Sequence, residues 1–208
     1  MSVVLPKKNL ADIIIELKKE HDYIKHDQIK ADVVVSKISC DSREVVAGDV
    51  FVAVSGVNQD GHDFIDMAVK KKVSLIIGER DLKSSFEVPY IKVEDSRAVY
   101  SSLCSNFFNN PADSLILIGI TGTSGKTTTS YIVEAILKEA EKKVGVIGTV
   151  ESRFEHHSWV NSHTTPDPFQ LHRIIYEMKE LGCEAIVMEV SSHALVQKRV
   201  HNICFNAA

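Results

Sequence analysis

Short apolar runs and helical apolar stripes follow one another in the second half of the chain. Residues 114–121 (SLILIGIT) form an almost wholly apolar run, which is typical of a buried strand in a parallel sheet. Beyond them a helix is predicted, because apolar residues recur at helical spacing with charged residues between them. Those apolar positions are Ile132, Val133, Ile136, Leu137 and Ala140. The pattern therefore predicts a strand, a loop and a helix in succession.

The same alternation continues toward the C-terminus. Residues 143–148 predict a second strand, and residues 183–190 predict a third, buried strand. Between them we expect a polar, mobile loop over residues 151–163 and then a helix from Pro168, with Asp167 as its N-cap. The apolar stripe of that helix consists of Leu171, Ile174, Ile175 and Met178. Alternating strands and helices favour an α/β fold with a mostly parallel sheet.

The first half predicts a smaller α/β unit. Strands are expected at residues 33–39, 50–54, 73–77 and 90–93, and helices at 8–19, 62–71 and 96–108. A turn signal, Asn109-Asn110-Pro111, then precedes the new pattern. We therefore expect two domains, residues 1–111 and residues 112–208. The second is expected to be incomplete, because a nucleotide-binding α/β sheet has about five or more strands and the sequence predicts fewer.

The loop at residues 121–129 (TGTSGKTTT) has the composition of a phosphate-binding loop. Its glycines let backbone N–H groups converge on one anion, and the following helix N-terminus adds partial positive charge. Lys126 is placed to reach the outer phosphates of a nucleotide, and the Thr127 hydroxyl is placed to bind its Mg²⁺. The usual motif has a further glycine five residues before Gly125, where this chain has Ile120. A plain strand-to-helix turn is the alternative, but the Gly-Lys-Thr-Thr ending favours an ATP or GTP site.

Composition and charge argue against several classes of protein, namely nucleic-acid-binding, membrane-spanning and secreted proteins. The net charge of −4, with 44% apolar and 25% charged residues, is typical of a globular protein without a broad basic surface for nucleic acid. No apolar run approaches the ~20 residues of a membrane span, and the first residues do not resemble a secretion signal. The four cysteines lack the spacing of a zinc or redox motif. We therefore expect reduced cysteines and a cytoplasmic location.

Glu189 lies near the end of the third predicted strand. Ligands of open α/β sheets collect at the carboxyl ends of the strands, where the glycine loop also lies. Glu189 is therefore expected to be a second Mg²⁺ ligand beside Thr127, with a solvent-facing acid as the alternative. His193 is a candidate for orienting a second metal or a phosphate, although a loop histidine is more often a surface residue. The run Ser191-Ser192-His193 does not indicate a hydrolase, because the Gly-x-Ser-x-Gly elbow is absent.

Three motifs resemble those of the Mur ligases of peptidoglycan synthesis, in the same order along the chain. They are residues 121–128 (TGTSGKTT), 164–167 (TTPD) and 188–195 (MEVSSHAL). The match is closest to the MurE type, whose uridine-nucleotide domain is similar to residues 40–43 (CDSR) and 47–54 (AGDVFVAV). The resemblance implies ATP and Mg²⁺ as cofactors. ATP would phosphorylate the D-glutamyl carboxylate of UDP-MurNAc-L-Ala-D-Glu, and the amine of meso-diaminopimelate or L-lysine would attack the acyl phosphate.

The resemblance also implies roles for individual residues. The implied ATP-binding residues are Gly122, Thr123, Ser124, Gly125, Lys126, Thr127 and Thr128, of which Lys126 is also the implied catalytic residue. The implied contacts of the UDP-linked substrate are Cys40, Ser42, Val57, Asn58, Gln59, His163, Thr164, Thr165, Ser191, Gln197 and Arg199. The implied metal-associated residues are Thr127, Glu189 and His193. Two positions depart from the family pattern, since Ser124 replaces the loop asparagine and His163 stands where some members have asparagine.

The resemblance further implies that the family's modified lysine and its C-terminal domain lie beyond residue 208, so the chain is expected to be inactive by itself. Other functions remain open. One is another Mur-type ligase or a folylpolyglutamate synthase with the same loop, although the CDSR segment argues against the latter. Another is a non-catalytic UDP-sugar-binding module. Lys126, Thr127 and Glu189 argue against that module, because a pure binder of UDP-sugar has no need of them.

Overall fold

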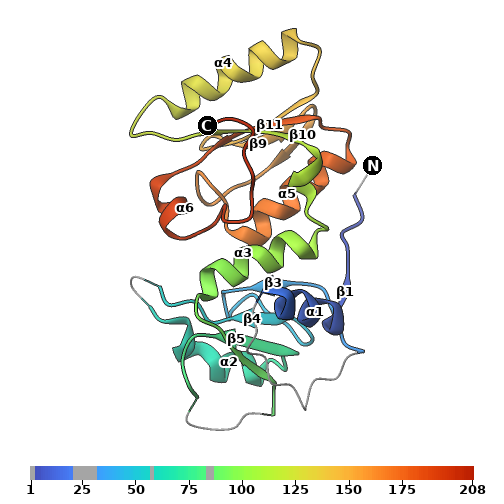
Figure 1. Ribbon diagram of the computed structural model, residues 1–208, viewed down its shortest axis with the longest axis vertical. Helices are drawn as coiled ribbons and strands as arrows, with labels where there is room; N and C mark the ends of the chain where they lie inside the picture. The colour runs from blue at the N-terminus through green and yellow to red at the C-terminus, as the bar shows by residue number, and fades with distance from the viewer. Residues whose placement is uncertain (1–2, 21–31, 57–58, 83–86) are drawn as a thin grey trace. The chain divides into compact units, whose positions relative to one another are not determined.

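The structure is a computed structural model of the 208-residue chain, and it describes residues 3–20, 32–56, 59–82 and 87–208 (Figure 1). It divides into two compact units. The first unit is Pro6–Phe107, and the second unit is Phe108–Ala208 together with Met1–Leu5. None of the helices in the described ranges is long and apolar enough to cross a membrane.

A four-stranded parallel sheet organises the first unit. Its strands lie in the order β3 (Ile38–Ser39), β4 (Val50–Val52), β5 (Leu75–Gly78) and β6 (Tyr90–Lys92). A short antiparallel pair, β1 (Lys8–Asn9) and β2 (Val34–Val35), lies outside this sheet. The helical segments are α1 (Leu10–Glu20), η1 (Gly61–Phe64), α2 (Ile65–Lys70) and α3 (Ser96–Phe107). Phe51, Ala53 and Ile76 of the sheet region pack against Ile65 and Ala68 of α2, because parallel strands must bury both faces under helices.

The second unit is built on a five-stranded sheet in the order β10-β9-β8-β11-β7. Its parallel strands are β7 (Ile116–Ile120), β8 (Val144–Ile147) and β11 (Ala185–Glu189), which match the three predicted strands. The 3-10 turn η2 (Pro111–Ser114) precedes β7. At the free edge of β7, Asn206 N donates to Leu117 O at 2.8 Å, and Gly119 N donates to Ala207 O at 2.9 Å. The expected α/β fold is therefore confirmed.

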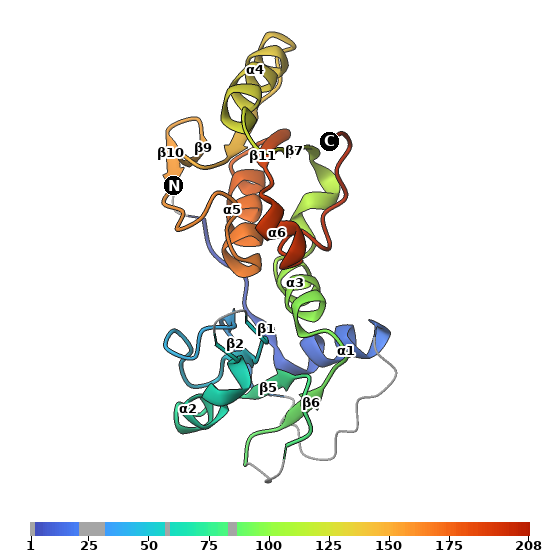
Figure 2. The same ribbon diagram turned by 90° about the vertical axis from the view of Figure 1, so that its left-hand side faces the viewer.

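Helices cover both faces of this sheet (Figures 1 and 2). On one face, Val133 and Leu137 of α4 (Lys126–Glu139) pack on Val144, Ala185 and Val187. The opposite face carries α5 (Pro168–Glu180) and the short α6 (Ser192–Val196). There the predicted stripe of α5 is buried against the sheet, together with Leu117, Ile186 and Met188. The prediction of Asp167 as the N-cap of α5 is confirmed, since its carboxylate accepts from the backbone N–H groups of Phe169 and Gln170.

Two expectations about this unit are corrected. Residues 151–163 are not an unstructured loop, because β9 (Ser152–Phe154) and β10 (His157–Trp159) form an antiparallel hairpin on the edge of β8. Phe154 is 1% exposed and anchors that hairpin in the core. Only part of the predicted apolar stripe of α4 packs against the sheet, since Ile132 and Ile136 are 56% and 62% exposed. The sheet contacts only the face of α4 that carries Val133 and Leu137.

Candidate functional site

The loop between β7 and α4 has the conformation that its glycines allow. Gly122 and Gly125 have φ angles of +145° and +80°, a region that side-chain-bearing residues rarely adopt. Gly125 is the N-cap of α4, so the loop leads directly onto a helix N-terminus. Lys126 Nζ donates to Gly122 O at 2.8 Å and thus lies folded back over the loop. Backbone N–H groups, a helix end and a lysine therefore meet at one exposed place, which suits the phosphates of a nucleotide.

Glu189, at the end of β11, is the central side chain of the site. It is 1% exposed, so the alternative of a solvent-facing acid is wrong. The Thr127 hydroxyl lies 3.0 and 3.1 Å from its two carboxylate oxygens. Thr149 adds two further donors, its backbone N–H at 3.2 Å from Oε1 and its hydroxyl at 3.0 Å from Oε2. Since β8, β11 and β7 are neighbours, the carboxyl ends of all three strands contribute to the environment of this carboxylate.

A hard divalent cation fits this pair of oxygen ligands. Mg²⁺ is usually bound by one or two protein oxygens together with water and phosphate oxygens, and Glu189 and Thr127 supply such oxygens beside the loop. Across the described ranges, no group of three or more His, Cys, Asp and Glu side chains is gathered as a metal site. His193, the third expected metal-associated residue, is exposed on α6 and lines a neighbouring pocket.

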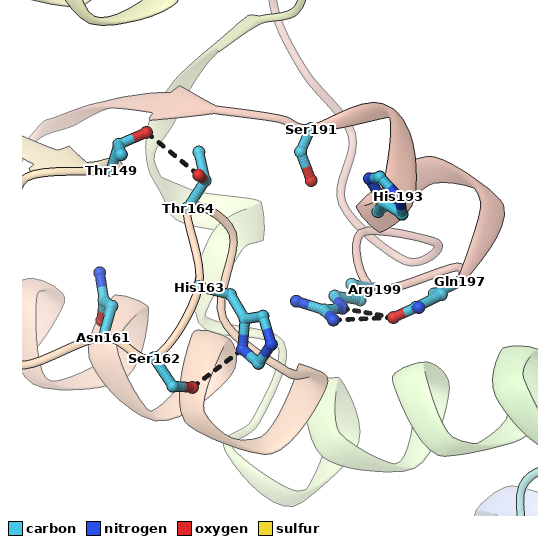
Figure 3. Close-up of a pocket in the computed structure, with 9 residues that line it drawn as sticks. All are labelled: Thr149, Asn161, Ser162, His163, Thr164, Ser191, His193, Gln197 and Arg199. Atoms are coloured by element: carbon cyan, nitrogen blue, oxygen red, sulfur yellow. Dashed lines mark hydrogen bonds between the residues drawn. The ribbon is translucent and has the colours of Figure 1, made fainter. Parts of the chain in front are cut away.

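That pocket, of about 570 Å³, is lined in part by Thr149, whose hydroxyl hydrogen-bonds to Glu189 (Figure 3). It brings together five of the residues expected to contact the UDP-linked substrate, namely His163, Thr164, Ser191, Gln197 and Arg199. The remaining lining residues are Thr149, Asn161, Ser162 and His193. Figure 3 shows the Ser191 hydroxyl pointing into the space between Thr164 and Arg199. The lining combines hydroxyls and amides with one guanidinium, which suits a polar, acidic ligand.

Buried hydrogen bonds hold the walls of the pocket in place. Thr165 is fully buried, and its hydroxyl donates to Glu189 O at 2.9 Å while accepting from Ser191 N at 3.1 Å. Thr165 therefore holds the backbone between Glu189 and Ser191 in place at the wall of the pocket. Arg199 donates to Thr165 O at 2.5 Å and to Gln197 Oε1 at 2.7 and 3.0 Å, so its guanidinium is oriented by the protein (Figure 3).

Sequence reasoning missed Thr149 and Asn161. Thr149 directly follows the predicted strand 143–148, so the rule that ligands collect at strand carboxyl ends would have singled it out. Asn161 lies in the stretch that was expected to be a mobile loop, and its amide donates to Ser152 Oγ at 2.5 Å. Neither residue belongs to a recognisable motif. The position of Thr149 just after a predicted strand is the sequence signal that could have identified it.

Five of the residues expected to contact the UDP-linked substrate belong to the first unit. Ser42 is 5% exposed and its hydroxyl lies 3.3 Å from Met67 Sδ, whereas Cys40 and Gln59 are exposed. The expected contacts Val57 and Asn58 lie outside the described residues. The lining of the pocket in the second unit comes entirely from residues 149–199.

Asp60 and His62 support the loop that contains Gln59. Asp60 Oδ1 accepts from the backbone N–H of His62 at 2.9 Å and lies 2.6 Å from its Nδ1. Because Nε2 of the same ring accepts from Glu79 N at 2.9 Å, Nδ1 is the nitrogen that carries the proton. The imidazole thus ties this loop to the end of β5.

A glycine-rich loop, a buried carboxylate and a polar pocket lie at the carboxyl edge of a parallel sheet, which is the arrangement expected of a nucleotide-binding α/β protein. Two sequence models of the Mur ligases match most of each unit. The Mur ligase family, catalytic domain, matches residues 34–108, and the Mur ligase middle domain matches residues 120–208. The chain belongs to the Mur ligase family.

Several similar proteins share one name. The UDP-N-acetylmuramoyl-L-alanyl-D-glutamate–2,6-diaminopimelate ligase of Geobacillus thermodenitrificans is 43% identical over 171 residues, which are 82% of this chain and 35% of that protein. The ligase of the same name from Clostridium tetani is 37% identical over 91% of this chain and 39% of that protein. A solved structure of a ligase with this name has a TM-score of 0.75 at 23% identity, covering 91% of this chain and 39% of that one. This chain therefore spans little more than a third of the length of these relatives.

Proposed function

We propose that this chain provides the nucleotide- and acceptor-binding part of an ATP- and Mg²⁺-dependent ligase of peptidoglycan precursor synthesis. The ligase joins an amino acid to the D-glutamate of UDP-MurNAc-L-Ala-D-Glu. The observation that carries the proposal is that Thr127 of the loop and Thr149 of the pocket wall both bind the buried carboxylate of Glu189. A nucleotide phosphate and an acceptor in the pocket would therefore meet at one carboxylate.

The reaction would proceed by phosphoryl transfer. An oxygen of the D-glutamyl carboxylate attacks the γ-phosphorus of ATP, the bond to the bridging oxygen breaks, and ADP leaves. The amino acid's amine then attacks the acyl carbon and expels phosphate, so that an amide bond forms. Such transfers depend on positioning and charge neutralisation.

The residues of this chain have distinct tasks in that scheme. Gly122–Thr128 and the α4 N-terminus would bind the phosphates, and Lys126 would leave Gly122 O for the outer phosphates. A Mg²⁺ ion held by Thr127 and Glu189 would supply neutralisation of the charge on the transferred phosphoryl group. Arg199, already oriented by Gln197, would bind an anionic group of the acceptor. Ser42, Cys40 and the loop over residues 57–59 are proposed for the UDP end, and His193 for a second metal or phosphate.

The finer identity of the whole enzyme is inferred from its relatives. Their names specify 2,6-diaminopimelate as the added amino acid, and we propose the same for the complete enzyme. All four cysteines lie in the described residues and none forms a disulfide, which supports a reducing, cytoplasmic location, and we propose a monomer. The match of residues 34–108 to the Mur ligase family disfavours a folylpolyglutamate synthase.

Calorimetric titration of the purified chain with UDP-MurNAc-L-Ala-D-Glu tests the proposal. We expect saturable binding, weakened about tenfold by Arg199→Lys, because a lysine loses the planar fork that Gln197 and Thr165 orient. Arg173→Lys is the matched control, since Arg173 pairs with Glu177 outside the pocket. Binding of a folylglutamate in place of the UDP compound would contradict the proposal.

A further inference from the structure

The Gly148-Thr149 turn lies directly against the Glu189 carboxylate. Thr149 binds both carboxylate oxygens, one through its backbone N–H and the other through its hydroxyl. A Cβ atom at Gly148 would lie 2.4 Å from Oε1 of Glu189, which is closer than any real contact. The absence of a side chain at residue 148 is therefore what lets the turn approach the carboxylate.

The proton on the Thr149 hydroxyl has a defined direction. A carboxylate oxygen can only accept, and a hydroxyl has one proton, so Thr149 Oγ1 donates to Glu189. The Thr164 hydroxyl lies 3.1 Å from Thr149 Oγ1 and must then donate to it (Figure 3). Thr149 is thus held between a donor on the pocket side and an acceptor on the loop side.

The Thr127 contact to Glu189 differs from the Thr149 contact in one respect. Both Thr127 and Glu189 are expected to bind the same cation, so their direct hydrogen bond would be given up when the cation binds. Thr149 has no such competing task, because its two donors face only the Glu189 carboxylate and its oxygen accepts from Thr164. It can hold the carboxylate in both states.

We infer that Thr149 is a positioning residue that orients the Glu189 carboxylate for Mg²⁺ through its hydroxyl and backbone N–H. The inference rests on the proposed function, since it requires that Glu189 bind the cation of a metal–nucleotide complex. Groups that orient metal ligands typically contribute 10–100-fold to metal affinity. A residue that only ends β8 would contribute nothing to it.

The test is a Mg²⁺ titration of ATP binding by the whole chain, followed by fluorescence of a labelled ATP analogue. Thr149→Val keeps the shape and the backbone N–H but removes the hydroxyl. We expect it to raise the Mg²⁺ concentration for half-maximal binding about tenfold while leaving Mg²⁺-free nucleotide binding unchanged. Thr149→Ser should restore the unaltered value. Ser158→Ala, the removal of a hydroxyl at an exposed residue of β10, is the control.

The possible outcomes distinguish failure of this inference from failure of the proposed function. An unaltered Mg²⁺ dependence in Thr149→Val overturns the inference and leaves the proposed function standing. An equal loss of nucleotide binding with and without Mg²⁺ also overturns it, because the variant would then have disturbed the loop rather than the metal ligand. If the unaltered chain binds no nucleotide at any Mg²⁺ concentration, the proposed function fails together with the inference.

Discussion

Glu189 is a buried residue whose carboxylate is nevertheless proposed to bind a cation. Its carboxylate is almost inaccessible, and a buried charge is tolerated only where hydrogen bonds replace water. Thr127 and Thr149 supply those bonds from two different strand ends. Sequence reasoning identified Glu189 and Thr127 because each belongs to a motif or ends a strand. Thr149 was missed because it belongs to no motif, although its position just after the strand at residues 143–148 was a usable signal.

His172, on α5, is a buried residue whose ionisation affects stability. It is fully buried, and neither ring nitrogen has a hydrogen-bond partner in the described structure. Burial lowers its pKa from 6.5 to about 3. Above pH 6.5 the imidazole is neutral in both the folded and the unfolded chain. Below it only the unfolded chain takes up the proton, so stability falls as the pH decreases toward 3.

We therefore expect His172→Leu to flatten the pH dependence of unfolding. Between pH 6.5 and pH 5, the free energy of unfolding of the unaltered chain should fall by about 2 kcal/mol more than that of the variant. Urea unfolding at several pH values measures this difference. His201→Leu, at an exposed histidine, should keep the dependence of the unaltered chain. Parallel curves for the unaltered chain and His172→Leu would contradict the assignment.

At the scale of elements, apolar periodicity predicted the helices and strands correctly wherever one face of an element packs in the core of the sheet. The stripe of α5 and the run of β11 are buried as predicted. The hairpin β9–β10 was missed because only Phe154 and Trp159 of its apolar residues pack against the core, too few to make a pattern. In α4, periodicity identified the helix but could not decide which apolar residues meet the sheet, because that depends on tertiary placement.

The N-cap of α5 gives a prediction at this scale. Asp167→Ala should lower the free energy of unfolding of the second unit by about 1 kcal/mol, because two backbone N–H groups lose their acceptor. Asp167→Asn should restore most of it. Denaturant titration measures the change, with the exposed Asp113→Ala as the control. A loss that Asn fails to recover would point to a role of the charge beyond capping.

At the scale of the whole molecule, the fold class was predictable because the alternation of strands and helices extends over both halves. The five-stranded sheet of the second unit was not fully predictable, since the edge hairpin and the Asn206–Ala207 contacts to β7 depend on pairing between distant segments. The polar pocket proposed for the acceptor was predictable only through the family resemblance, because its lining residues are scattered over residues 149–199.

The proposed enzyme should not turn over with this chain alone. The relatives are more than twice as long as this chain, and we expect the site for the added amino acid to lie in the part that this chain does not match. Phosphate release in the presence of ATP, Mg²⁺, UDP-MurNAc-L-Ala-D-Glu and 2,6-diaminopimelate should equal that of Lys126→Ala. Amino-acid-dependent release that disappears in Lys126→Ala would contradict this expectation.

The central claim is that the loop, Lys126 and the Thr127–Glu189 pair form a metal–nucleotide site. Calorimetric titration of the purified chain with ATP in Mg²⁺ tests it most directly. We predict one site per chain and a loss of about 10- to 100-fold in affinity for Lys126→Ala, the worth of a charge-assisted contact to phosphate. Lys138→Ala, in the last turn of the same helix, should bind as the unaltered chain does. No saturable binding, or equal affinities for the unaltered chain and Lys126→Ala, would contradict the account.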